Sequence, residues 1–175
     1  MVYRESRRHS KRTELAGQDR NTNHGAVLQD APEISADVIA SYRAADYRAG
    51  TVGDAFTLRV NQYSEPLARL FTVSGHQCAV FITACNPFGR LQSHEVNLAA
   101  CALLHQRLWQ LVNRKDHIIE GVGCDPAGLW PAEKSFLALG LGLEASRNLG
   151  REFCQNAVVW MDEDAIPKLV LLRQA

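Results

Sequence analysis

The chain has 175 residues, a mass of 19.4 kDa and 46% hydrophobic residues, which is enough to build one domain with its own core. Nineteen basic and nineteen acidic residues leave no net charge, and this excludes bulk electrostatic attraction to nucleic acid or an anionic membrane. No apolar run approaches the roughly 18 residues of a membrane span, and the start has no apolar segment of a secretory signal. Five cysteines without C-x-x-C spacing favour free thiols and a cytoplasmic location.

Residues 1–33 are predicted to form a disordered polar tail, because they show no aliphatic periodicity. Its first part is basic: residues 1–12 hold five basic residues against Glu5, a net charge of +4. The tail is either an arm for nucleic acid or an acidic protein, or an appendage that an early start codon adds. Outside residues 1–12 we expect no binding of nucleic acid. Residues 34–175 are predicted to form a single domain.

The first predicted elements of this domain are a helix, a strand and a second helix. Ser35 is a suitable N-cap, and the apolar residues after it follow a helical spacing that ends near Gly50. Residues 55–60 alternate weakly and predict a strand. Ser64 and the proline that soon follows predict the start of the second helix, which Gly75 closes.

The most apolar short run of the chain covers residues 78–84 and predicts an interior strand that is buried on both faces. An Asn-Pro turn follows it, and Ser93 then caps a long helix that reaches about residue 112. A helix is also predicted at about 143–152, and further strands at about 116–122, 135–141, 156–161 and 168–173. The order αβαβαββαββ predicts an α+β (mixed α/β) domain in which helices pack on a mixed sheet of about six strands.

Four segments of the chain together resemble the DUF3293 family of uncharacterised bacterial proteins. They are Phe81–Pro87 (FITACNP), Ser93–Asn97 (SHEVN), Gly128–Leu137 (GLWPAEKSFL) and Gly150–Ala157 (GREFCQNA). The resemblance runs from about residue 38 to 172, and Cys154 stands where the family pattern usually has glycine. Because the family has no established activity, the resemblance implies a fold and approximate boundaries and does not imply a function.

Asn97 lies at the centre of the apolar face of the long helix when its residues are placed at 100° intervals. A buried amide without partners costs about 1–3 kcal/mol, and the nearest groups along the chain belong to the turn at Asn86. Two interpretations stay open. Asn97 either ties this turn to the helix or lines a pocket at the C-terminal end of strand 78–84, where open α/β sheets place ligands.

Other polar residues also stand at the ends of predicted elements. The start of the long helix offers free N–H groups that favour an anion, although Glu95 can satisfy them. Glu133 precedes an apolar strand and is interpreted either as a general acid or base or as a surface partner of Lys134, Arg147 or Arg151. The many amides favour recognition of a neutral polar group. The candidate ligand-binding residues are Asn86, Arg90, Ser93, Asn97, Glu133, Gln155 and Asn156.

The first functional hypothesis is a protein that binds an unknown small polar molecule in this pocket. The second is an enzyme that uses Glu133, and the third is an adaptor that binds through the basic tail. We expect no cofactor and no metal, because Cys101 and His105 lack a third ligand at a suitable spacing. Cys78 and Cys101 are predicted to be inert thiols that face the core, and Cys85, the best-placed thiol for chemistry, is interpreted as buried and inert.

Overall fold

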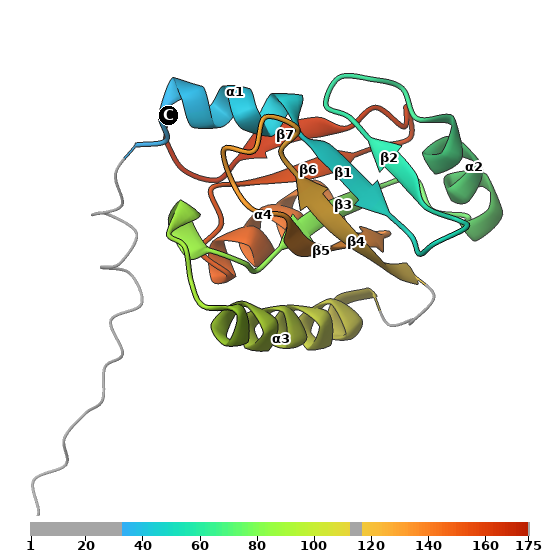
Figure 1. The fold of residues 1–175 in the computed structure, drawn as a ribbon. Coiled ribbons are helices and arrows are strands. Elements are labelled where there is room, and N and C mark those ends of the chain that lie inside the picture. The colour runs from blue at the N-terminus through green and yellow to red at the C-terminus, as the bar shows by residue number, and fades with distance from the viewer. Residues whose placement is uncertain (1–32, 113–116, 175) are drawn as a thin grey trace, which may run out of the picture. The chain divides into compact units, whose positions relative to one another are not determined.

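The computed structural model describes residues 33–112 and 117–174, so the predicted tail and its basic segment lie outside the described residues, apart from residue 33. Figure 1 shows the elements in chain order. They are α1 (Ala36–Ala44), β1 (Asp46–Ala49), β2 (Phe56–Leu58), α2 (Glu65–Ser74), β3 (Ala79–Thr83), the 3-10 turn η1 (Pro87–Gly89), α3 (His94–Val112), β4 (Ile118–Cys124), β5 (Glu133–Leu139), α4 (Leu143–Glu152), β6 (Ala157–Met161) and β7 (Lys168–Leu171).

The strands of the described residues form one seven-stranded sheet in the order β2-β1-β4-β5-β3-β6-β7. Every pair of neighbours in it is antiparallel. The predicted α+β domain is confirmed, with seven strands in place of about six. The sheet is antiparallel throughout instead of mixed. Three pairs of neighbours, β1–β2, β4–β5 and β6–β7, are also consecutive in the chain and run in opposite directions. The remaining pairs join these hairpins to one another or to β3, and they too are antiparallel.

The strand that the sequence analysis missed is β1. The first helix was expected to end near Gly50, but α1 ends at Ala44 and Asp46–Ala49 form the strand. Tyr47 and Ala49 are buried, and the intervening Arg48 is exposed. This period of two is typical of a strand. Pairing with both β2 and β4 satisfies the backbone groups of β1, and this tertiary pairing overrides the weak helical pattern.

Interior strand β3 divides the hydrophobic core between the two faces of the sheet. Ala79 and Phe81 belong to the core that α2 covers, whereas Val80 and Ile82 belong to the core that α3 and α4 cover. Figure 1 shows α3 along one side of the sheet, away from α1 and α2. The prediction that this strand is buried on both faces is therefore confirmed.

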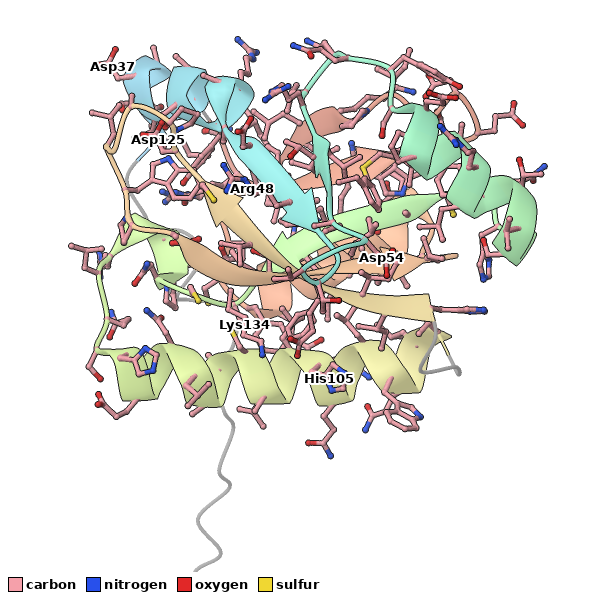
Figure 2. All side chains as sticks on the ribbon, turned by 45° about the vertical axis from the view of Figure 1, so that its right-hand side comes forward. Asp37, Arg48, Asp54, His105, Asp125 and Lys134 are labelled. Carbon is pink, nitrogen blue, oxygen red and sulfur yellow. The ribbon has the colours of Figure 1, made fainter. Side chains whose placement is uncertain are left out.

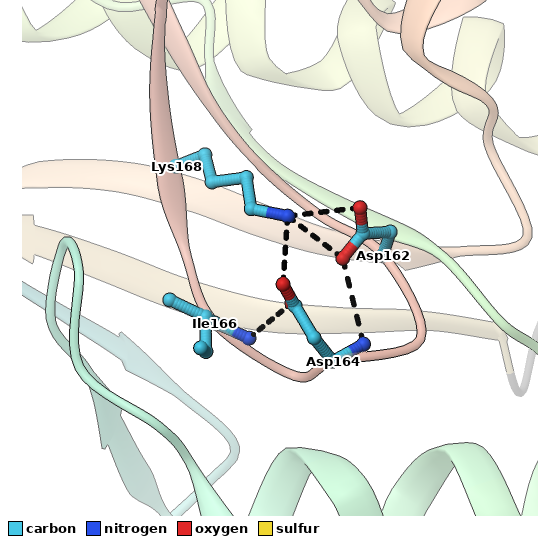
Figure 3. A network of polar contacts seen from close by, with 4 residues as sticks. All are labelled: Asp162, Asp164, Ile166 and Lys168. Carbon is cyan, nitrogen blue, oxygen red and sulfur yellow. Dashed lines mark hydrogen bonds and ion pairs between the residues drawn. The ribbon is translucent and has the colours of Figure 1, made fainter.

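Several local predictions agree with the structure. The Ser35 and Ser64 side chains accept hydrogen bonds from backbone N–H groups in the first turns of α1 and α2, and Gly75 ends α2 in the left-handed conformation. In the turn between β6 and β7, Lys168 Nζ binds the carboxylates of Asp162 and Asp164, each at 2.8 Å (Figure 3). These exposed ion pairs shape the turn and contribute little to global stability.

Candidate functional site

A cavity of about 420 Å³ lies beside the carboxyl end of β3. Its walls come from α1, from η1, from the loop between β4 and β5 and from the end of the chain after β7. Figure 2 labels Asp37 on α1 and Asp125 at the start of the β4–β5 loop, at the same end of the molecule. The volume falls in the range of about 300–1,000 Å³ that small-molecule sites occupy.

The β4–β5 loop is shaped by the buried carboxylate of Asp125. Its two oxygens accept hydrogen bonds from the backbone N–H groups of Ala127 and Leu129 at 2.9 and 2.7 Å. The loop then carries Trp130 into the cavity wall, where its ring meets that of Tyr42 edge-on at 6.4 Å. The Asp-Pro-x-Gly sequence is typical of such a turn, but it does not indicate which wall the following tryptophan joins.

Asn86 joins three separate parts of the chain. It is buried and adopts a left-handed backbone with φ of 48°. Its Nδ2 donates to Glu133 Oε1 at 2.7 Å, and its Oδ1 accepts from Gln92 N and Asn97 Nδ2. The backbone N–H of Asn86 donates to Asn97 Oδ1 at 2.9 Å. Asn97 therefore ties the turn to α3, as the first interpretation expected, and it lies outside the cavity lining.

Glu133 begins β5 and lines the cavity with a partly buried carboxyl group. Burial raises its pKa from 4.5 to about 7, and the nearby Cys85 adds to this rise, whereas the hydrogen bond from Asn86 opposes it. At neutral pH the carboxyl group is thus close to half protonated. In that state it is able both to donate and to accept a hydrogen bond.

Of the two interpretations of Glu133, the surface ion pair is wrong. Because the start of β5 turns this side chain toward the cavity, its partner is the amide of Asn86. The three basic residues considered for it are engaged elsewhere: Lys134 with Glu120, Arg147 with Glu144 and Arg151 with Asn148.

Gln155 and Asn156 precede β6, line the cavity and are largely committed to protein partners. Gln155 Nε2 donates to the carbonyl oxygens of Cys85 and Phe153, both at 3.1 Å. Asn156 Nδ2 donates to the Tyr42 hydroxyl at 3.0 Å, and Asn156 Oδ1 accepts from Arg173 Nε at 2.8 Å. The amides therefore position side chains of the cavity wall, among them a tyrosine and an arginine that the sequence analysis did not single out.

Two side chains of the cavity wall keep buried donors without a partner in the described residues. They are Arg173 through Nη1 and Trp130 through Nε1. The Arg173 guanidinium also lies over the Phe88 ring at 5.1 Å, and burial lowers its pKa. Neither residue was a candidate site residue from the sequence, because their places in the same cavity wall depend on the fold.

Arg90 and Ser93 do not line the cavity. Ser93 Oγ accepts from Val96 N at 3.3 Å, so it caps α3 as predicted. Arg90 is exposed before the helix. The structure thus brings Asn86, Glu133, Gln155 and Asn156 together and leaves the anion site considered at the start of α3 apart from them.

A pair of thiols lies under the turn at the end of β3. Cys85 and Cys101 are both buried, with their Sγ atoms 3.4 Å apart. The hydrogen bond from the Cys101 thiol lowers the pKa of Cys85 to about 6, and the pKa of Cys101 is raised in turn. The predicted core position is confirmed for Cys101, whereas Cys78 is only partly buried. Within the described part of the chain, no three His, Cys, Asp or Glu side chains gather as metal ligands.

Residues 82–158 match the model of the family described as "Protein of unknown function (DUF3293)". The resemblance inferred from the sequence is confirmed over this stretch, which includes Asn86, Glu133 and Asn156 and excludes Tyr42 and Arg173. No curated protein and no solved structure matches the chain. None of the helices in residues 33–112 and 117–174 combines the length and the apolar character needed to cross a bilayer.

Proposed function

We propose that this member of DUF3293 binds a small polar ligand in the cavity beside the carboxyl end of β3. The observation that carries the proposal is the composition of the cavity wall. Five aromatic side chains and several aliphatic ones share the wall with polar and charged residues, so the cavity offers both apolar contacts and hydrogen-bonding groups to a ligand. The aromatic residues are Tyr42, Tyr47, Phe81, Phe88 and Trp130.

The polar groups of the wall support ligand binding because their positions are held by hydrogen bonds from behind. Within the described residues, the Glu133 carboxyl group accepts a hydrogen bond only at Oε1, from Asn86. The other carboxyl oxygen therefore stays available for a ligand. Asn156 holds the Tyr42 hydroxyl as an acceptor, which leaves the tyrosine hydrogen available as a donor. Positioned side chains of this kind bind a ligand with a smaller loss of conformational entropy.

The proposal is tested by incubating the full-length protein with a small-molecule cell extract, followed by desalting and native mass spectrometry. We expect the wild type to retain a small molecule. Val38, on α1, lines the cavity, so Val38→Trp should fill the space and abolish retention. The matched control is Val73→Trp on α2, where the side chain is exposed. A wild type that retains nothing, or a Val38→Trp protein that is folded and retains as much, contradicts the proposal.

Catalysis by Glu133 is the second candidate function. A general acid or base works best with a pKa near the working pH, and the pKa of about 7 for Glu133 at a cavity wall meets this condition. The same extract separates the two functions when its composition is followed over time. If the protein is an enzyme, the wild type should convert a compound of the extract that the Glu133→Gln variant binds without converting. If it is a binding protein, the amount of any compound removed from the extract should not exceed the amount of protein added.

A further inference from the structure

From the charges and rings of the cavity wall we infer that the ligand is a small organic cation, an amine with a flat apolar body, whose ammonium group binds the Glu133 carboxyl group. This inference rests on the proposed function and names the ligand class. The wall holds three carboxyl groups, those of Glu33, Asp37 and Glu133, against the single guanidinium of Arg173. A cleft lined by an excess of one charge attracts ligands of the opposite charge.

Glu133 offers the ammonium group an acceptor that a ligand in the cavity is able to reach. Its Oε1 accepts from Asn86 Nδ2 at 2.7 Å, and its Oε2 has no partner among residues 33–112 and 117–174. Oε2 is not buried either, because the buried side-chain atoms without a partner in these residues are Trp130 Nε1 and Arg173 Nη1. Since Glu133 lines the cavity, this accessible oxygen is available to a ligand there.

Within the described residues, no basic side chain neutralises Glu133. Burial is the main cause that raises its pKa, and of the two groups that modify this effect Asn86 is a neutral donor and Cys85 is acidic. Burial also raises the pKa values of Tyr42 and Tyr47 in the same wall, and the negative charge of Glu133 adds to both rises. A partly buried carboxylate among acidic neighbours is stabilised by a cation.

The basic group of the cavity wall, Arg173, is engaged away from Glu133. Its Nε donates to Asn156 Oδ1 at 2.8 Å, its Nη1 is buried, and its guanidinium lies over the Phe88 ring at 5.1 Å. Glu133 is not among the described groups that influence the pKa of Arg173. Arg173 therefore supports the wall and leaves the counter-ion of Glu133 to the ligand.

Glu33 and Asp37 extend the negative charge to the opening of the cavity. Both are exposed, with Asp37 in the first turn of α1, and neither forms an ion pair with a described residue. Exposed carboxylates elsewhere do form such pairs, for example Glu144 with Arg147 on α4. Charges at an opening attract a cationic ligand, but water and salt screen them, so they contribute less to its affinity than Glu133 does.

The aromatic wall specifies the body of the ligand. Aromatic rings attract a cation over their faces and pack against flat apolar groups. The rings of Tyr42 and Trp130 meet edge-on with their centroids 6.4 Å apart, so they do not stack face to face and cover both of their faces. A cavity of about 420 Å³ accommodates one substituted ring. A bare ammonium ion would leave this aromatic wall without contacts.

Four probes of the full-length protein test the inference: benzylamine, which is protonated at neutral pH, benzyl alcohol, benzoate and methylamine. Benzyl alcohol keeps the ring without the charge, benzoate reverses the charge, and methylamine keeps the charge without the ring. NMR follows the indole N–H resonances of the three tryptophans, with Trp130 assigned from Trp130→Phe. We expect benzylamine to shift the Trp130 resonance and to bind at least about tenfold more tightly than each other probe, because hydrogen bonds between charged groups are strong.

Variants of Glu133 test which group binds the ammonium. Glu133→Gln keeps the size and the acceptor for Asn86, and it should lower the affinity for benzylamine about tenfold, to that for benzyl alcohol. Glu133→Asp keeps the charge on a shorter side chain and should retain part of the preference. Glu163→Gln is the matched control, since it removes the same charge from an exposed residue outside the cavity lining. Thermal unfolding identifies variants that do not fold, and if Glu133→Gln is one of them, Glu133→Asp decides.

Each contrary result has a separate meaning. Benzyl alcohol or benzoate that shifts Trp130 and binds as tightly as benzylamine overturns the inferred charge and leaves the proposed binding function standing. Methylamine that binds as tightly overturns the flat apolar body. A folded Glu133→Gln protein that binds benzylamine as the wild type does overturns the role of Glu133. Benzylamine that leaves Trp130 unshifted overturns the inference as a whole, whereas the proposed function is judged by the extract experiment.

Discussion

Asn86 donates a hydrogen bond to Glu133 across 2.7 Å and thereby connects the carboxyl end of β3 to the start of β5. The two strands are neighbours in the sheet, with Thr83 opposite Ser135 at the last pair of their ladder. Beyond that pair the backbones separate, and the side-chain bond takes over where backbone pairing ends. The candidate site is therefore built at the point where β3 leaves the sheet.

Glu133→Gln should make the protein less sensitive to pH. Because burial raises the pKa of Glu133 from 4.5 to about 7, the folded state disfavours the carboxylate, and the stability of the wild type falls as the pH rises from about 4.5 through 7. Glutamine stays neutral and keeps an acceptor for Asn86. As the pH rises from 4 to 8, the free energy of unfolding of the variant should increase by roughly 3 kcal/mol relative to that of the wild type. Urea unfolding at each pH measures this difference. A difference that does not depend on pH would show that Glu133 titrates normally.

Asn97→Leu should destabilise the protein by about 1–3 kcal/mol. The variant removes the acceptor of the Asn86 backbone N–H and a donor to the Asn86 side chain, at 2.9 and 3.0 Å. Urea unfolding measures the loss. Asn148→Leu is the control, because Asn148 is an exposed asparagine on α4. An Asn97→Leu protein as stable as this control would mean that water replaces both bonds at no cost.

Cys101→Ala should raise the pKa of Cys85. The Cys101 thiol is the main cause that lowers this pKa to about 6, and removing a donor from a partly buried thiolate disfavours the charged form. We expect a rise of at least about one unit, followed by thiolate ultraviolet absorbance in a protein with Cys78 and Cys154 changed to serine. Cys124→Ala in the same background should leave the titration where it is. An unchanged midpoint in Cys101→Ala would assign the low pKa to other groups.

Cys154→Gly should stabilise the protein, since Cys154 adopts a left-handed backbone with φ of 54°. A side chain in this region costs about 1 kcal/mol, and glycine avoids that cost. The gain is partly offset because glycine makes the unfolded chain more flexible. Thermal unfolding should show a midpoint at or above that of the wild type. Cys124→Gly, in strand β4, provides the contrast and should lower the midpoint. A clear loss of stability in Cys154→Gly would indicate that the packing of the thiol contributes more free energy than the strained backbone costs.

Local signals in the sequence predicted much of the fold. Ser64 and Gly75 bound α2, and α4 occupies residues 143–152, as expected, because caps and hydrophobic period act within a few residues. The same kind of signal placed Asn86 after an interior strand and Asn97 on the inner face of α3. Local signals failed at β1, where the apolar residues fit both the period of two of a strand and the period of 3.6 of a helix. There the pairing with β2 and β4 decides that the segment is a strand.

The cavity itself was decided by the tertiary structure. Four of the seven predicted site residues line it, because they stand at ends of strands that meet at one edge of the fold. Tyr42 and Arg173 come from opposite ends of the domain. They meet because Asn156 bonds to both and the backbone of Ile34 bonds to that of Gln174. Such contacts follow from strand order and antiparallel pairing, which bring distant segments together and leave no periodic trace in either segment.

The protonation of Glu133 and the unpartnered buried donors of Arg173 and Trp130 were likewise decided by the tertiary structure. The sequence shows a carboxyl group before an apolar strand, an arginine at the end of the last predicted strand and a tryptophan at the end of a turn. Whether each of these groups is solvated, paired or buried without a partner depends on the dielectric and the neighbours that the packed chain provides. Those neighbours exist only after the β4–β5 loop, α1 and the end of the chain have closed around the cavity.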